Sequence, residues 1–180
     1  MFFRLGATIL KQKSKKQHLI EEWLRKYTTY LKREDEFDPE RLKRYKAGDL
    51  ITVEFGYNVG AEYGGRHYAI VIEDSALKAK MITVIPLTSL PIKANVNRHD
   101  VDLGILPQIK KIDKTANQHA KSVALINQIR SISKQRIVAP TNKAHEVVYI
   151  EGSLLQEIYH KLITRYTTKG LKRQYPSQNK

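Results

Sequence analysis

The sequence contains no cysteine among its 180 residues. This absence excludes disulfides and thiolate metal sites, and it suits a reducing compartment such as the cytosol. Long apolar runs are also missing, since no stretch approaches the roughly 20 residues that a membrane-spanning helix needs. The apolar start MFFRLGATIL differs from a secretory signal, because Arg4 interrupts it and the lysines follow the apolar run. We therefore expect a cytoplasmic protein without a membrane segment.

Acidic residues are scarce relative to basic ones. The chain has 18 Asp and Glu against 32 Lys and Arg, which gives a formal net charge of +14. Such an excess favours a polyanionic partner, which could be nucleic acid, an acidic protein or an anionic membrane. The length fits one domain of ordinary size with an extension.

The N-terminal quarter of the chain has a helical pattern. Between Ser14 and Glu34, apolar residues recur at helical spacing and lysines and arginines occupy the other face, which predicts an amphipathic helix. Such a helix could pack on a core with a solvated basic face, or it could bind RNA. Asp38 followed by Pro39 predicts a capped short helix that runs to Tyr45. We assign residues 1–45 to a helical extension.

Beyond residue 45 the pattern changes to short runs rich in valine and isoleucine. These runs predict strands at residues 49–55, 68–73, 81–89, 98–103 and 122–132. Short strands separated by loops favour a small, strongly curled antiparallel barrel over an alternating α/β fold. An apolar stripe predicts a closing helix over residues 154–163. The predicted domain spans residues 46–166, and the basic segment 167–180 is expected to be a mobile tail.

The loop GYNVGAEYGGRH, residues 56–67, is the best candidate for a reactive site. It brings Asn58, Glu62, Arg66 and His67 close together in sequence, and Thr88 ends a later apolar run that could lie alongside. These residues offer an acid, a base and phosphate-binding groups. Metal-binding HExxH, phosphate-binding Walker and multi-carboxylate motifs do not occur in the sequence, so we predict neither a metal nor a cofactor.

Three ordered segments carry a family resemblance: GDLITVEFGYNVGAEYGGRHYAIVI, ITVIPLTS and SVALINQIRSISKQRI. They resemble the successive signature blocks of the MazF/PemK toxins over roughly residues 46–165. The resemblance implies a mainly β fold with flanking helices, built on a small SH3-like antiparallel barrel that forms a homodimer. It also implies a sequence-specific endoribonuclease that is neutralised by an antitoxin. Such enzymes use the 2′-hydroxyl of the RNA as nucleophile without a metal, and they leave a 2′,3′-cyclic phosphate and a 5′-hydroxyl.

The same resemblance suggests the catalytic residues. In the family, an arginine after the glycine-containing loop and a threonine at the end of the later strand act at the scissile phosphate. Thr88 matches that threonine, whereas His67 stands where the family usually has arginine and Arg66 precedes it. A histidine with a pKa near 6.5 exchanges protons near neutrality, so His67 could take over proton transfer while Arg66 binds phosphate. Neighbouring strand residues point to opposite faces, and we favour His67 if only one enters the site.

Other residues are predicted in supporting roles. Glu62 could accept a proton or orient Arg66, or it could be an exposed loop carboxylate. The glycines permit positive φ angles and close approach of RNA. For Gln128 and Arg130, holding the strand or the dimer together is the alternative to binding RNA. The predicted RNA-contacting residues are Asn58, Gly64, Gly65, Ser89, Gln128 and Arg130.

Three functions remain open at this point. The first is cleavage of single-stranded RNA, because in-line attack by the 2′-oxygen requires a backbone free to leave A-form geometry. An acidic antitoxin segment would then suit the basic groove. The second is a non-catalytic SH3-like module that binds nucleic acid or protein. The third, by analogy with toxins of related fold, is poisoning of a topoisomerase, and no residue favours it over RNA cleavage.

Overall fold

The computed structural model describes residues 14–112, 119–141, 146 and 148–167. Its first described element is helix α2 (Ser14–Lys32), close to the predicted helical span. The second predicted helix is shorter than expected. Asp38 caps it by accepting a hydrogen bond from the Glu40 amide, but only a 3-10 turn, η1 (Pro39–Arg41), follows. The chain after Leu42 is instead held in the body, where Tyr45 is fully buried and its hydroxyl donates to the Pro140 carbonyl.

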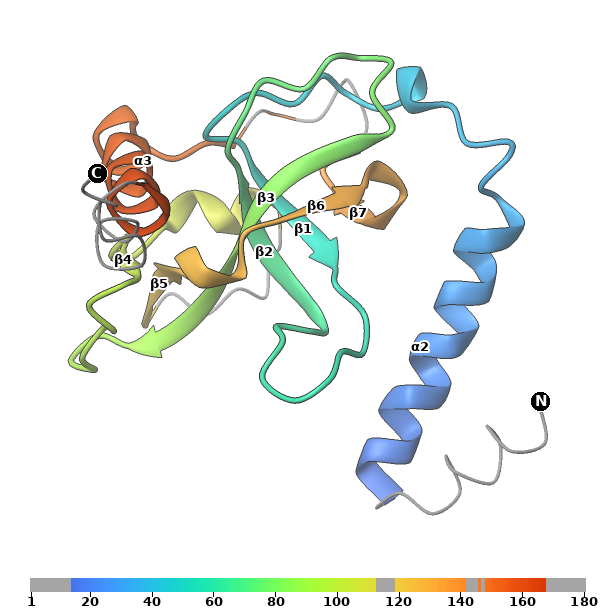
Figure 1. The fold of residues 1–180 in the computed structure, drawn as a ribbon, viewed down its shortest axis with the longest axis horizontal. Coiled ribbons are helices and arrows are strands. Elements are labelled where there is room, and N and C mark those ends of the chain that lie inside the picture. The colour runs from blue at the N-terminus through green and yellow to red at the C-terminus, as the bar shows by residue number, and fades with distance from the viewer. Residues whose placement is uncertain (1–13, 113–118, 142–145, 147, 168–180) are drawn as a thin grey trace, which may run out of the picture.

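Seven strands form one antiparallel sheet, as Figure 1 shows. They are β1 (Leu50–Glu54), β2 (Arg66–Val71), β3 (Met81–Pro91), β4 (Val101–Asp102), β5 (Ala120–Ala124), β6 (Arg130–Ser133) and β7 (Ile137–Ala139). The strand order is β4-β5-β3-β2-β1-β7, and β6 also pairs with β3. The mainly antiparallel β architecture predicted from the sequence is confirmed.

The sheet is open, so the prediction of a closed barrel is wrong. Among the described residues, the ladders end with β4 at one edge and β7 at the other, and none joins these two edges. The edge strands are two and three residues long, too short for a continuous closing ladder. The sheet curls without closing.

The predicted strand over residues 122–132 is in fact two strands. Both pair with β3: β5 opposite residues 87–91 and β6 opposite residues 81–84. Two residues of β3 lie between these pairings, whereas five residues separate β5 from β6. The extra residues form the 3-10 turn η3 (Ile126–Gln128), which buries Ile126 and places Gln128 beside the candidate loop. Strand β7 was not predicted, because its three residues are too few to show a period.

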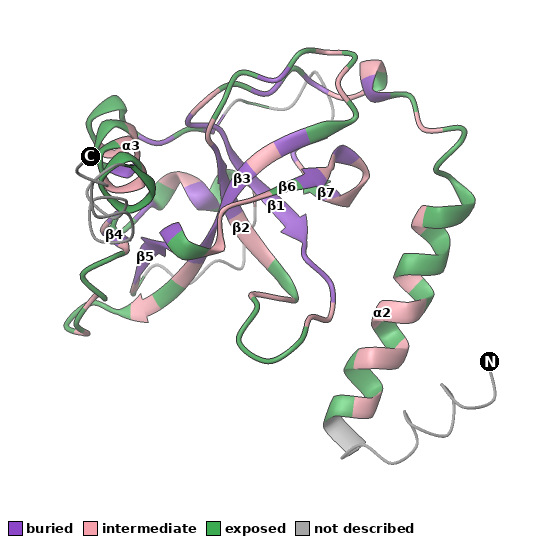
Figure 2. Cartoon of the chain, viewed as in Figure 1, coloured by how far each residue is buried: buried purple, intermediate pink, exposed green. Residues whose placement is uncertain are grey.

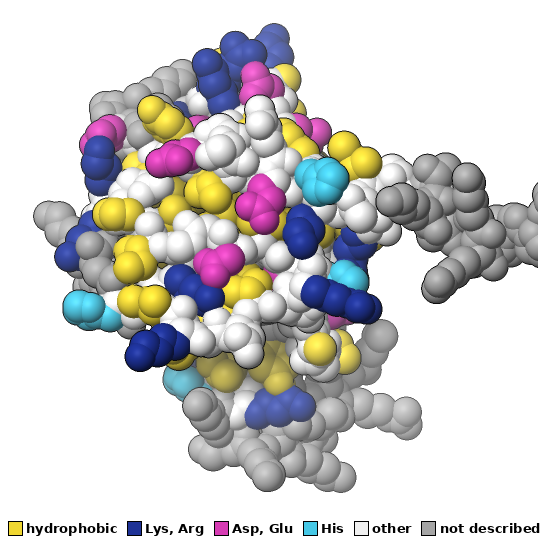
Figure 3. Space-filling view, turned by 90° about the vertical axis from the view of Figure 1, so that its left-hand side faces the viewer, with side chains coloured by type: hydrophobic (Ala, Val, Ile, Leu, Met, Phe, Trp, Pro, Cys, Tyr) yellow, Lys and Arg dark blue, Asp and Glu magenta, His cyan; other side chains and the backbone are white. Residues whose placement is uncertain are grey.

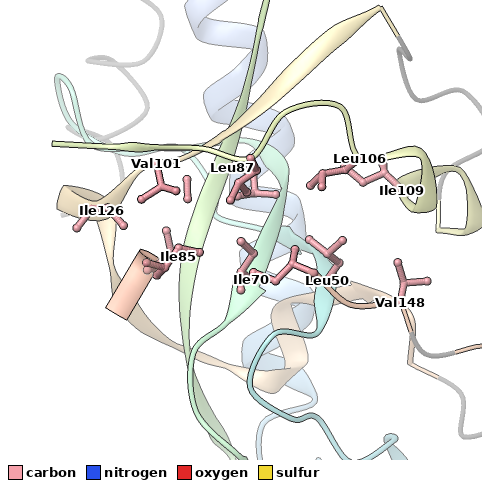
Figure 4. Packing of buried hydrophobic residues seen from close by; sticks show 13 residues of the cluster. Leu50, Ile70, Ile85, Leu87, Val101, Leu106, Ile109, Ile126 and Val148 are labelled. Atoms are coloured by element: carbon pink, nitrogen blue, oxygen red, sulfur yellow. The ribbon is translucent and has the colours of Figure 1, made fainter. Parts of the chain in front are cut away.

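Both faces of the sheet are covered, and every residue of β1 is buried (Figure 2). Leu50 and Ile70 belong to one apolar cluster, shown in Figure 4, which α3 (Gly152–Tyr166) covers with Ile158. Ile51 and Val53 belong to a second cluster that includes Tyr45. Alternate residues of a strand point to opposite faces, so β1 contributes to both clusters. Each fully buried aliphatic side chain stabilises the fold by roughly 1.5–3 kcal/mol.

The predicted C-terminal helix is confirmed as α3, and its stripe of Leu154, Leu155, Ile158 and Leu162 packs on the first cluster. Figure 3 views the molecule from the side on which α3 lies, and there basic side chains are interspersed with acidic and apolar ones. No described helix is long and apolar enough to cross a membrane. Most of the predicted tail, residues 168–180, lies outside the described residues.

Candidate active site

The candidate site is built on the loop that joins β1 to β2. Phe55 and Gly65 close it, since the Phe55 amide donates to the Gly65 carbonyl at 2.8 Å and the Gly65 amide donates to the Gly56 carbonyl at 2.6 Å. A Cβ atom on Gly64 would lie only 2.6 Å from the carbonyl oxygen of Gly56. Residue 64 therefore has to be glycine for the two ends of the loop to approach so closely.

Two amide side chains hold this loop in place. The Asn58 side chain donates to the carbonyl of Tyr63 at 2.8 Å. Gln128 accepts a hydrogen bond from the Tyr63 amide at 3.1 Å and donates to the carbonyl of Ala61 at 3.3 Å. The same Gln128 oxygen accepts from the Arg130 guanidinium at 2.7 Å. These bonds tie Gln128 to both the loop and Arg130.

His67 lies against Tyr63, four residues earlier in the loop. The two ring centroids are 4.3 Å apart, and the Tyr63 hydroxyl lies 3.0 Å from His67 Nδ1. The same hydroxyl donates to the carbonyl oxygen of Leu87 at 2.8 Å. A carbonyl can only accept, so the single hydroxyl proton of Tyr63 is committed to Leu87. We infer that Nδ1 of His67 supplies the hydrogen in its own contact with Tyr63.

In this tautomer Nε2 of neutral His67 carries the lone pair, and the Gly64 carbonyl accepts a hydrogen bond from the ring when it is protonated. Nε2 faces the glycines of the loop, since a Cβ atom on Gly65 would lie 3.4 Å from it. Burial lowers the pKa of His67, and a backbone hydrogen bond with Gly64 together with the charge of Glu54 opposes that shift. The ring is therefore more often neutral at pH 7 than an exposed histidine. A neutral, oriented imidazole can act as a general base.

Thr88 and Arg130 are both connected to Tyr63, Thr88 through its side chain and Arg130 through Gln128. Burial raises the pKa of Tyr63, and a hydrogen bond with the Thr88 side chain partly opposes the shift. The Arg130 guanidinium lies 5.4 Å from the centre of the Phe55 ring, and burial lowers its pKa. The structure thus brings His67, Thr88 and Arg130 together around Tyr63, although they are distant in sequence.

Arg66 belongs to a different group, on the opposite face of β2. In the ladder between β1 and β2, Arg66 is paired with Glu54, whereas His67 is paired with Val53 of the second core cluster. Nε of Arg66 lies 3.5 Å from the Glu54 carboxylate, whose side chain is only 5% exposed. Lys26 of α2 binds the same carboxylate oxygen at 2.9 Å. The expectation that Arg66 and His67 point to opposite faces is borne out in this geometry.

Helix α2 packs against the start of the loop through Trp23. A Cβ atom on Gly56 would lie 2.5 Å from the Trp23 ring, so the indole fits only because residue 56 is glycine. The Arg136 guanidinium lies 5.3 Å from the centre of the Trp23 ring and donates to the carbonyl of Phe55. A cavity of about 550 Å³ remains between α2 and the loop, and Glu62 is among its lining residues.

Three residues of this region were not predicted from the sequence. Tyr63 orients His67, Glu54 connects Arg66 to α2, and Trp23 anchors α2. The four-residue spacing of Tyr63 and His67 within one loop was a usable signal for the first. Of the remaining predicted site residues, Glu62 is an exposed loop residue and Ser89 an exposed residue of β3. Side chains able to hold a metal do not cluster anywhere in the described ranges.

Comparison with known proteins connects this arrangement to a family. A family model described as PemK-like, MazF-like toxin of type II toxin-antitoxin system matches residues 46–164. The chain belongs to this toxin family. The match spans the sheet, the loop and most of α3, whereas α2 lies outside it. Among curated protein sequences, none matches the chain.

Solved structures with a similar fold include MazF of Deinococcus radiodurans, at 23% identity and a TM-score of 0.46, which covers 67% of this chain and 94% of that one. A MazE–MazF complex from the same organism gives 20% identity and a TM-score of 0.43, covering 67% and 93%. A mycobacterial endoribonuclease bound to its cognate antitoxin gives 10% identity and a TM-score of 0.43, covering 67% and 92%.

Proposed function

We propose that this toxin cleaves single-stranded RNA through the 2′-hydroxyl of the substrate. The observation that carries the proposal is the Leu87–Tyr63–His67 hydrogen-bonded chain, which leaves Nε2 of a half-buried histidine as a base. Membership of the PemK/MazF-like toxin family supports the same activity. The metal-independent chemistry expected from the sequence is retained in this proposal.

In this mechanism Nε2 of His67 takes the proton of the 2′-hydroxyl as the 2′-oxygen attacks phosphorus. The bond from phosphorus to the 5′-oxygen breaks, and the departing oxygen takes a proton from solvent. The products are a 2′,3′-cyclic phosphate and a 5′-hydroxyl. Thr88 donates its hydroxyl hydrogen to a phosphate oxygen, and Arg130 stabilises the negative charge that develops there.

Arg66 has a separate role in this proposal, because its side chain lies on the other face of β2. The Arg66 side chain is 55% exposed, and its guanidinium binds a flanking phosphate of the RNA rather than the reacting one. Glu62 is exposed in the loop, and its negative charge favours the charged form of Arg130. Asn58 and Gln128 hold the loop, while Gly64 and Gly65 allow the RNA backbone to approach.

The test is incubation of the purified protein with defined single-stranded RNA in excess EDTA, followed by mapping of the ends. We expect a 2′,3′-cyclic phosphate at each cut, and loss of cutting in His67→Ala. His160→Ala is the matched control, because His160 is an exposed histidine of α3. Continued cleavage of RNA with a 2′-deoxy sugar at the cut site would disprove the mechanism.

A non-catalytic binding module is the second candidate, and the position of Arg66 favours it. A reacting phosphate beside His67 would lack the Arg66 guanidinium, which Glu54 holds on the opposite face. The same loop would then recognise RNA without cutting it. Tight RNA binding by the wild-type protein, with no products after long incubation, would identify this function.

We also propose that the protein forms a homodimer and is neutralised by an acidic antitoxin. The family to which it belongs is that of toxin-antitoxin systems, and the net charge of +14 suits an acidic partner. Light scattering of the purified protein measures the first property. Co-expression with the neighbouring gene product, followed by co-purification, tests the second.

A further inference from the structure

Helix α2 is attached to the candidate loop by a small set of specific contacts. Trp23 fits against the bare backbone of Gly56, and Lys26 binds the buried carboxylate of Glu54. Residues 33–36, which follow the helix, are all exposed. Leu19 and Leu31 also remain 45% and 49% exposed, so much of the apolar surface of α2 is not used in this docking. A helix held in this way can leave its site without unfolding the sheet.

The docked helix controls Arg66 through a shared carboxylate. Nζ of Lys26 lies 2.9 Å from Oε2 of Glu54, and Nε of Arg66 lies 3.5 Å from the same oxygen. Two cations therefore compete for one buried carboxylate, and α2 supplies the closer one. Any ligand that draws Arg66 away from Glu54, or any change that removes Lys26, alters the equilibrium between docked and undocked α2.

The cavity under α2 carries an excess of negative charge. Its lining includes three carboxylates, of Glu22, Glu54 and Glu62, but only two cations, Lys26 and Arg66. Lys26 is further engaged by Glu22 at 2.7 Å. A polyanion entering this cavity meets an excess of negative charge, although the chain as a whole is strongly basic.

We propose that α2 is an intramolecular cover of the site loop, which single-stranded RNA must displace in order to bind. The proposal rests on the RNA-directed function proposed above and adds its regulation. With α2 docked, Trp23 and Lys26 occupy the outer side of the loop at Gly56 and Glu54. When α2 leaves, that side of the loop opens, and Trp23, Glu22 and Lys26 leave the cavity with the helix. The apparent affinity for RNA is then reduced by the fraction of molecules in which the helix is docked.

The test uses the fact that Trp23 is the only tryptophan in the chain. We would saturate the full-length protein with single-stranded RNA that carries 2′-O-methyl groups and cannot be cleaved. Tryptophan emission and its quenching by acrylamide then report the surroundings of α2 alone. Displacement predicts a red-shifted emission and stronger quenching in the presence of RNA.

Point variants give a second measurement. Lys26→Ala weakens docking, so RNA should bind about two- to fivefold more tightly, although the variant has lost a positive charge. Arg25→Ala is the matched control, because it removes one exposed cation from α2 without touching Glu54, and it should not tighten binding. Circular dichroism melting of each variant checks that the fold is retained.

Two results would overturn the proposal. If RNA protects Trp23 from acrylamide and Lys26→Ala weakens binding, α2 is a wall of the RNA groove instead of a cover. If RNA binds without changing Trp23 emission, and Lys26→Ala binds as the wild type does, α2 plays no part in binding. The cleavage assay in EDTA is read separately, so displacement of α2 without cleavage would refute the proposed nuclease activity and leave the cover intact.

Discussion

The Tyr63 hydroxyl lies 3.0 Å from Nδ1 of His67, and the two rings are 4.3 Å apart between centroids. This contact orients the imidazole, and donation of the hydroxyl proton to Leu87 favours the tautomer that carries its hydrogen on Nδ1. The proposed action of His67 as a base therefore depends on Tyr63 as well. Its consequences can be measured in variants of either one.

Tyr63→Phe removes the hydroxyl and keeps the ring. We expect kcat for RNA cleavage to fall roughly 10-fold with little change in KM, because His67 loses its fixed tautomer but stays in place. Tyr149→Phe, at an exposed tyrosine, is the control and should cleave like the wild type. An unchanged kcat in Tyr63→Phe would show that the contact does not orient the base.

The pH dependence of cleavage should follow His67. Burial lowers its pKa, so we expect kcat/KM to fall on the acid side with a midpoint below the ordinary value of 6.5. The stability of the fold should also fall toward acid pH. Folding favours the neutral ring, so its contribution is present above pH 6.5 and is lost as the pH falls through the folded pKa. Rates and urea unfolding measured against pH test both statements, and an acid midpoint above 6.5 would contradict them.

Gly64→Ala should destabilise the loop. The added methyl group would lie 2.6 Å from the Gly56 carbonyl oxygen, so the hydrogen bond that closes the loop must lengthen. We expect a loss of about 1–3 kcal/mol in the free energy of unfolding. Gly152→Ala, in α3, meets no atom within 4 Å and should be neutral or slightly stabilising. Equal unfolding midpoints for the two variants would show that the loop tolerates a side chain at residue 64.

Gln128→Ala separates a structural role from RNA recognition. The side chain binds Tyr63, Ala61 and Arg130, so its loss should lower the free energy of unfolding by about 1–3 kcal/mol. Asn127→Ala, at the exposed neighbouring residue, is the control. If Gln128→Ala instead changes the RNA sequences that are cut while its stability stays the same, Gln128 reads bases.

Sequence pattern predicted the elements whose residues carry their own period. The helical stripes gave α2 and α3 nearly to their ends, and the runs of valine and isoleucine gave β1, β2 and β3. The sequence pattern did not predict the structure where an element was very short or where the pairing of strands decided it. Strand β7 is too short to show a period. The predicted strand over residues 122–132 is divided by η3, because β5 and β6 pair with different parts of β3.

For the site, the sequence by itself determined which reactive groups are present and that Arg66 and His67 point to opposite faces, because alternation along a strand is a local property. Only the tertiary structure decided their partners. Tyr63 meets His67 and Leu87 because the loop folds back on β3, and Glu54 joins Arg66 to Lys26 because α2 docks on the loop. The contacts of Tyr63 with Leu87 and of Glu54 with Lys26 depend on how distant segments pack, and no local pattern in the chain encodes them.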